Sequence, residues 1–240
     1  MPIGIGGDRV TFEARDLDGG LATRWTAAMR ACAFELLSSA TGRCVIAFIN
    51  AGHNDVVIYP NLDYTPANWE NAETGPINGA DAYYKGRPVR GPDGLVSGER
   101  ENGTGTGSTS IMAFTPWRFH GPFEGSANLI HELLHAAQQG RGVLYANKLE
   151  YKFDTQAEFD AIVVENIYRS EKGIKLRANH HGWARLTGLM VPADAGYAKL
   201  INSFRARTPQ LARNLGNLPL QWNPFRPGAQ GYAPPPGAAG

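Results

Sequence analysis

Residues 126–140 read SANLIHELLHAAQQG, and apolar residues recur in this stretch at helical spacing. One face of a helix drawn through it collects the apolar residues Ile130, Leu133, Leu134 and Ala137. Ser126 is a suitable N-cap before the first of them, and Gly140 is a typical C-terminal stop. The pattern therefore predicts a helix over residues 126–139 with one buried face.

The same helix carries the pattern H-E-x-x-H, formed by His131, Glu132 and His135. Residues four apart lie one turn apart on the same face of a helix. The two imidazoles can therefore bind one Zn²⁺ without distorting the backbone, and Glu132 is close enough to polarise a water molecule on the metal. The pattern predicts a catalytic zinc site, which also needs a third protein ligand and an open fourth position.

The next predicted helix, over residues 155–171, is the best source of the third ligand. Thr155 and Glu158 form a capping-box pattern at its start. Glu158 and Glu165 are seven residues apart, so both carboxylates face the same way, whereas Asp160 points elsewhere. We favour Glu158 as the metal ligand over Glu165. Alternatively, one glutamate binds the metal and the other orients a histidine ligand through a hydrogen bond.

Other side chains compete for supporting roles. His180 and His181 are a rival source of a metal ligand, or of a group that stabilises an oxyanion. Tyr168 and Arg169 follow the two glutamates on the same predicted helix. Either of them can donate a hydrogen bond to a developing oxyanion, because zinc peptidases generally need a second electrophile. We assign Tyr168, together with Glu132, to the catalytic set.

The remaining chain mixes helical patterns with short apolar runs. Three- and four-residue apolar spacing predicts helices over 19–39 and 197–207. β-rich runs predict strands over 44–49, 56–59 and 110–114, the first two forming a hairpin. We expect the strand over 109–114 to be the sheet edge that pairs with an extended substrate, because it comes just before the zinc helix.

Two segments have a different composition. Residues 60–108 hold nine Gly and five Pro and predict a long irregular insertion. In residues 222–240, nine of 19 residues are Pro or Gly, which predicts an extended or disordered tail. We therefore expect one domain over residues 1–221 with an α+β fold of the zincin type. A small mixed or antiparallel sheet would pack on the active-site helix and on the ligand-bearing helix that follows it.

Composition narrows the classes of function. The chain has 240 residues, 42% of them hydrophobic, and a net charge of +1. A net charge close to zero argues against nucleic acid or an anionic membrane as the main partner, because both usually bind proteins with a basic surface. No apolar run is long enough for a transmembrane helix, and the start of the sequence lacks the pattern of a signal peptide. Cys32 and Cys44 cannot build a disulfide framework. They fit a cytosolic protein as buried thiols, and a single bridge between them is the alternative.

The chain resembles the NleD-like effector metallopeptidases over roughly residues 20–185. The resemblance lies in Thr106–Ile111, in the segment Leu129–Ala136 with its H-E-x-x-H pattern, and in Ala157–Glu171 of the following helix. These are bacterial zinc proteases that are delivered into other cells. Similar domains occur at the C-terminal ends of polymorphic toxins. The resemblance implies zinc on His131 and His135, catalysis by Glu132, and a carboxylate ligand at Glu158.

Together these features predict a zinc-dependent endopeptidase with one Zn²⁺ per chain and a protein substrate. The resemblance further implies a cognate inhibitor or immunity protein. It also implies a bacterial cytoplasmic stage before secretion into a target or host cell, by a route without a cleaved signal peptide. Two alternatives stay open at this point: a non-catalytic zincin-like module that binds a metal or a partner, and a metal-free interaction protein in which the pattern is accidental.

Overall fold

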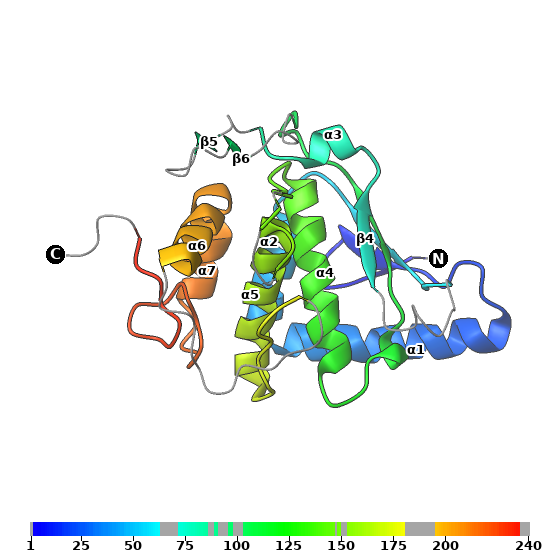
Figure 1. The fold of residues 1–240 in the computed structure, drawn as a ribbon. Helices are drawn as coiled ribbons and strands as arrows, with labels where there is room; N and C mark the ends of the chain where they lie inside the picture. The colour runs from blue at the N-terminus through cyan, green and yellow to red at the C-terminus, as the bar shows by residue number, and fades with distance from the viewer. Residues whose placement is uncertain are drawn as a thin grey trace.

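In the computed structural model, the chain combines a mixed β-sheet with a set of packed α-helices, which makes it an α+β protein (Figure 1). The structure confirms the expected α+β class, whereas the zincin type stays a prediction. The structure describes residues 2–62, 72–85, 89–90, 96–97, 103–146, 148–149, 153–180 and 195–235.

The main sheet has five strands in the order β1-β2-β3-β7-β4. They are β1 (Ile3–Gly4), β2 (Val10–Phe12), β3 (Val56–Tyr59), β7 (Ser110–Ala113) and β4 (Glu73–Pro76). The strands β2, β3 and β7 run parallel to one another, whereas β1 and β4 are antiparallel to their neighbours. A separate antiparallel ladder pairs β5 (Val89–Arg90) with β6 (Val96–Ser97).

This topology confirms two predicted strands and corrects one expected role. The runs over 56–59 and 110–114 form β3 and β7. However, β7 lies between β3 and β4, so the expectation that the strand over 109–114 is an edge was wrong. The sheet ends instead at β4, which comes from the segment expected to be an irregular insertion.

Seven α-helices and one 3₁₀ helix are found in the described residues. They are α1 (Gly19–Ser38), α2 (Ala40–Asn50), α3 (Gly79–Ala82), the 3₁₀ helix Pro116–Arg118, α4 (Glu124–Gly140), α5 (Gln156–Lys172), α6 (Ala195–Arg207) and α7 (Pro209–Gly216). The helix α4 packs against β4 and β7 and also against α5. Figure 1 shows α4 and α5 in the middle of the molecule, with β4 beside α4 and the pair α6 and α7 beyond α5.

The strand predicted over 44–49 is wrong, because these residues lie in helix α2. Ser39 caps this helix by accepting a hydrogen bond from the backbone N–H of Gly42 at 2.8 Å. Glu171 of α5 accepts two more from the backbone N–H groups of Ala40 and Thr41, at 2.6 and 2.9 Å. A short apolar run does not distinguish a strand from a buried helix. The local cap by Ser39 and the distant acceptor Glu171 both stabilise the start of the helix. The hairpin expected between 44–49 and 56–59 is therefore absent as well.

The helix that carries the H-E-x-x-H pattern begins two residues earlier than predicted, and Ser126 is not its cap. Phe123 stands at the N-cap position in the left-handed region, with φ 63°. Ser126 is fully buried inside the first turns, where its hydroxyl donates to Glu35 at 2.9 Å. In contrast, Thr155 caps α5 as predicted and accepts a hydrogen bond from the Glu158 N–H at 3.2 Å.

The C-terminal segment is folded over the residues that the structure describes, so the expected disorder of the tail is wrong for 222–235. Trp222 is 1% exposed and Phe225 is 6% exposed, and both belong to the hydrophobic core. The Asn223 side chain donates to the Leu215 carbonyl at 2.8 Å, which ties the segment to the end of α7. The rest of the expected tail, residues 236–240, lies outside the described residues.

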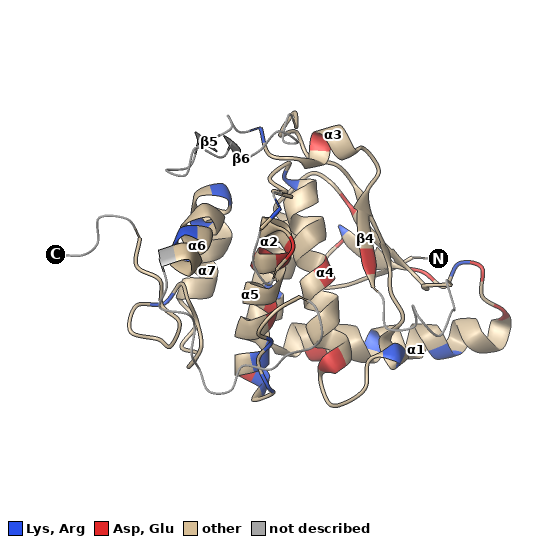
Figure 2. Cartoon of the chain, in the orientation of Figure 1, with Lys and Arg blue, Asp and Glu red and all other residues tan. Residues whose placement is uncertain are grey.

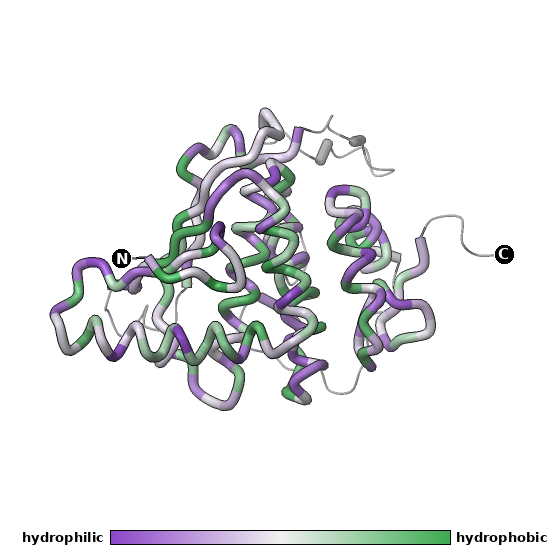
Figure 3. Tube along the Cα trace, turned by 180° about the vertical axis from the view of Figure 1, so that it is seen from behind, coloured by the Kyte–Doolittle hydropathy of each residue, from purple (hydrophilic) through white to green (hydrophobic). Residues whose placement is uncertain are grey.

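The core gathers residues from the sheet and from the central helices. Figure 3 shows hydrophobic segments concentrated in these elements, and Figure 2 shows charges of both signs interspersed along the chain. Among the described residues, no single helix is long and apolar enough to cross a membrane. Only α1 and α2 taken together pass a test of length and composition, and they are bent by 101° where they meet. Each of the two helices contributes buried residues to the core.

Candidate metal centre

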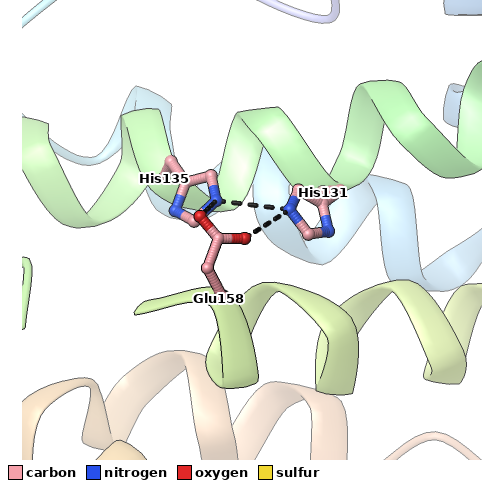
Figure 4. Close-up of side chains that lie close together, drawn as sticks. All are labelled: His131, His135 and Glu158. Carbon is pink, nitrogen blue, oxygen red and sulfur yellow. Dashed lines mark hydrogen bonds and ion pairs between the residues drawn. The ribbon is translucent and has the colours of Figure 1, made fainter. Parts of the chain in front are cut away.

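Three side chains of types that can bind a metal ion meet where α4 packs against α5, and we call them the metal group. His131 and His135 lie one turn apart on α4, and Glu158 comes from the first turn of α5 (Figure 4). Their candidate ligand atoms all lie within 4.8 Å of one another, so the group could hold a metal ion. His131 is 5% exposed and His135 is 8% exposed, which means that the group is largely shielded from solvent.

The separation of the two imidazole nitrogens suits tetrahedral coordination, and the carboxylate lies within reach of both. The Nε2 atoms of His131 and His135 are 3.3 Å apart. The Glu158 carboxylate spans them, with Oε2 at 3.1 Å from His131 Nε2 and Oε1 at 3.4 Å from His135 Nε2. Two ligand atoms bound at about 2.0–2.1 Å to a tetrahedral zinc lie about 3.3–3.4 Å apart. Two imidazoles and a carboxylate at these spacings therefore fit a zinc site.

The electrostatics of the group also favour a cation. Burial alone would lower the pKa of His131, but its hydrogen bonds to Glu158 and Glu165 and their negative charges outweigh burial and raise the pKa to about 10. Burial likewise acts to raise the pKa of Glu158, yet the positive charge of His135 and the hydrogen bonds to both histidines hold it far below its usual value. The carboxylates thus stabilise positive charge at this point, which either a proton or a metal ion can supply.

Glu165 contacts the other ring nitrogen of His131. Its Oε2 atom is 3.1 Å from His131 Nδ1, and its side chain is fully buried. Burial acts to raise the pKa of Glu165, but the charge of Arg177 and the hydrogen bond to His131 outweigh burial and lower the pKa to about 2. An ionised carboxylate can only accept hydrogen bonds, so Nδ1 is the donor and Nε2 is directed at Glu158 and His135.

Two arginines keep Glu165 in place. Arg169 Nε donates to Glu165 Oε1 at 2.6 Å, and Arg177 NH1 donates to Oε2 at 2.8 Å. Arg169 is also paired with Glu124, so its guanidinium is committed to buried ion pairs rather than directed at the metal group. This geometry matches the alternative in which the two glutamates share the work: Glu158 faces both histidines and Glu165 orients one of them.

Glu132 points from the same helix toward the edge of the sheet. It is half-buried, and its Oε2 atom accepts a hydrogen bond from the Thr74 hydroxyl at 2.8 Å. Thr74 lies in β4, within the segment expected to be an irregular insertion. Nothing in the spacing of the sequence links residues 58 positions apart, so sequence reasoning missed this contact.

His180 lies beside the metal group, whereas His181 is outside the described residues. The Nε2 atom of His180 is 3.2 Å from Glu158 Oε2, and its Nδ1 atom is 2.6 Å from Asp154 Oδ2. Its ring is nearly parallel to that of His131, with centroids 6.1 Å apart. Arg177 donates to the His180 backbone carbonyl at 3.0 Å, which connects this loop to the Glu165 cluster.

Tyr168 does not belong to this group. It is fully buried, and its hydroxyl donates to Ser126 Oγ at 2.6 Å, near the start of α4. It also lies ten residues after Glu158, about 15 Å along the axis of α5. The expected role of Tyr168 in oxyanion stabilisation is therefore not supported by its position. Asp160 points away from the metal group as expected, and pairs with Arg207 of α6 at 2.6 Å.

Three comparisons with known proteins found no relative of this chain. No protein-family description matches the chain, and neither a curated protein nor a solved structure matches it. The account of the site therefore stands on the positions and chemistry of these side chains.

Proposed function

We propose that this protein is a zinc-dependent endopeptidase that hydrolyses peptide bonds of a protein substrate. The observation that carries the proposal is that His131 Nε2 and His135 Nε2 lie 3.3 Å apart and that each contacts one oxygen of the Glu158 carboxylate, at 3.1 and 3.4 Å. Two histidines and one carboxylate are a ligand set typical of catalytic zinc, because they leave a fourth position for water or substrate.

Each residue has a defined task in this proposal. His131, His135 and Glu158 hold the ion, and Glu165 keeps His131 in the tautomer that presents Nε2. Zinc bound there would lower the pKa of a bound water molecule and polarise a carbonyl oxygen. Glu132 accepts a proton from the attacking water and returns it to the leaving amine.

The strand β4 replaces the strand over 109–114 as the proposed docking site for an extended peptide. β4 ends the sheet and packs against the helix that carries His131 and His135. The Ile77 N–H bonds to the Thr109 carbonyl, so by alternation the Thr74 N–H and the Pro76 carbonyl face away from β7. The Thr74 carbonyl already accepts a hydrogen bond from Gln139. Pro76 is tolerated there because a sheet edge needs no N–H donor at that position.

His180 takes over the role first given to Tyr168. It is the partly exposed donor next to the metal group, and Asp154 fixes its ring through Nδ1. In its doubly protonated form, a histidine held by a carboxylate at Nδ1 can donate through Nε2 to a developing oxyanion. The site thus still has a second group that can stabilise an oxyanion, but this group is His180, beside the metal group, and not Tyr168.

A second candidate function is a closed, non-catalytic metal site. The 3.2 Å distance between His180 Nε2 and Glu158 Oε2 favours this alternative, since a small movement would make His180 a fourth ligand. The affinity for zinc distinguishes the two. A His180→Asn variant that binds zinc as tightly as the wild type supports the open, catalytic site, and a large loss of affinity supports the closed one.

The function itself is tested by comparing the wild type with Glu132→Gln, using unfolded casein and a mixture of peptides from a digested proteome as substrates. We expect the wild type to cleave with zinc, and the variant to lose at least about 10²-fold in rate while it keeps one zinc per chain. Full activity in Glu132→Gln would rule out the proposed role of Glu132. The resemblance adds delivery into another cell and an inhibitor protein, and both stay predictions.

A further inference from the structure

The hydroxyl of Thr74 makes a direct contact with the proposed general base. Thr74 Oγ1 lies 2.8 Å from Glu132 Oε2 and 3.5 Å from the Glu132 carbonyl oxygen. A carboxylate oxygen can only accept, so Thr74 is the donor. The contact joins the edge strand of the sheet to the residue directly after the first histidine of the motif.

The strand holds Thr74 in a fixed orientation. In the ladder, Thr74 pairs with Met112 of β7, and Met112 pairs with Ile58 of β3. Met112 and Ile58 are fully buried against the helices, so Thr74 presents its side chain to the same face of the sheet. This direction brings the hydroxyl to α4 rather than to solvent.

A second residue of α4 secures the same strand. Gln139 Nε2 donates to the Thr74 backbone carbonyl at 3.3 Å, and Gln139 Oε1 accepts from the Ser110 hydroxyl of β7 at 2.6 Å. Gln139 is 3% exposed, so these bonds are shielded from water. Both the backbone and the side chain of Thr74 are therefore attached to the helix that carries the motif.

We propose that Thr74 is a positioning residue for Glu132. Its hydrogen bond restricts the rotation of a half-buried carboxylate and occupies one oxygen, which leaves the other oxygen for the proton of the attacking water. The proposal rests on the proposed function, because it gives Glu132 the role of base. It goes further by linking that base to the strand along which an extended peptide would lie, through a residue that the motif does not contain.

The contact itself is tested without activity, by a double-mutant cycle in metal-free protein. The urea midpoint is measured for the wild type, Thr74→Val, Glu132→Ala and the double variant. We expect Thr74→Val to lower the midpoint in the wild-type background and to have a clearly smaller effect when Glu132 is already alanine. Equal effects in both backgrounds would overturn the contact on which the proposal depends.

The positioning role is tested by kinetics on the zinc-loaded protein. We expect Thr74→Val to lower kcat about tenfold with little change in KM and one zinc per chain retained, since orientation rather than binding is lost. Thr74→Ser keeps the hydroxyl and should restore most of kcat. Thr11→Val is the matched control, because Thr11 lies in β2 on the opposite face of the sheet and should leave kcat unchanged.

Two results would overturn the role: an unchanged kcat in Thr74→Val, or a loss in Thr74→Ser as large as that in Thr74→Val. Failure of the proposed function is a distinct outcome. In that case the wild type does not cleave peptide, whether or not it binds zinc, and whatever the double-mutant cycle in metal-free protein gives.

Discussion

Single residues determine how the candidate metal-ligand atoms are oriented. Each ring nitrogen of His131 has its own carboxylate, Glu165 at Nδ1 and Glu158 at Nε2, both at 3.1 Å. The H-E-x-x-H spacing predicted the two histidines, and helical periodicity predicted that both glutamates face the same way. Periodicity could not say which glutamate faces the metal side, because that depends on how α5 packs against α4.

Glu165→Gln should weaken zinc binding without removing a ligand. The amide cannot fix the His131 tautomer as an ionised carboxylate does, so we expect zinc affinity to fall by about 10- to 100-fold. Competition with a chromophoric chelator measures the change. Asp160→Asn is the matched control, since Asp160 is another fully buried carboxylate on α5 but pairs with Arg207 instead of a ligand. Equal affinities for Glu165→Gln and wild type would contradict the orienting role.

At the scale of elements, α5 connects the site to the rest of the fold. Its first turn supplies Glu158, and Glu171 near its other end accepts from two backbone N–H groups of α2 and from the Thr41 hydroxyl. This capping contact spans about 130 residues of sequence, so no local pattern could reveal it. The run over 44–49 was therefore predicted as a strand although it forms part of α2.

Glu171→Ala should destabilise the fold through α2. The change leaves the Ala40 and Thr41 N–H groups without their acceptor and removes a negative charge from a helix N-terminus. We expect the free energy of unfolding to fall by about 1–2 kcal/mol, as measured by urea denaturation. The exposed Glu73→Ala is the control and should change it by less than about 0.5 kcal/mol. A loss in Glu171→Ala no larger than in the control would show that the contact contributes no stability.

At the scale of the whole molecule, the metal group joins two central helices that carry much of the core. The α+β class and most helices could be predicted because their apolar periodicity is strong and local. The edge position of β4 and the packing of Trp222 could not, because a Pro- and Gly-rich composition predicts loops without saying what they cover. Buried anchors such as Trp222 hold the C-terminal segment against the core despite that composition.

Metal binding should therefore stabilise the whole fold. An ion bound between α4 and α5 favours the folded chain by mass action, by about 2.7 kcal/mol when free zinc is 100 times its Kd. We expect the Tm to rise when zinc is added to metal-free protein and to fall again with excess EDTA. A His135→Asn variant should show little response. A wild-type Tm that changes neither with zinc nor with EDTA would indicate that no ion binds the folded chain.

The central claim is that His131, His135 and Glu158 together form one metal site. The most direct measurement is the zinc content per chain, by elemental analysis, of the wild type, Glu158→Ala and Asp160→Asn purified side by side. The account predicts about one zinc per chain in the wild type and in Asp160→Asn, and a marked loss in Glu158→Ala. No zinc in the wild type, or the same zinc content in Glu158→Ala as in the wild type, would contradict it.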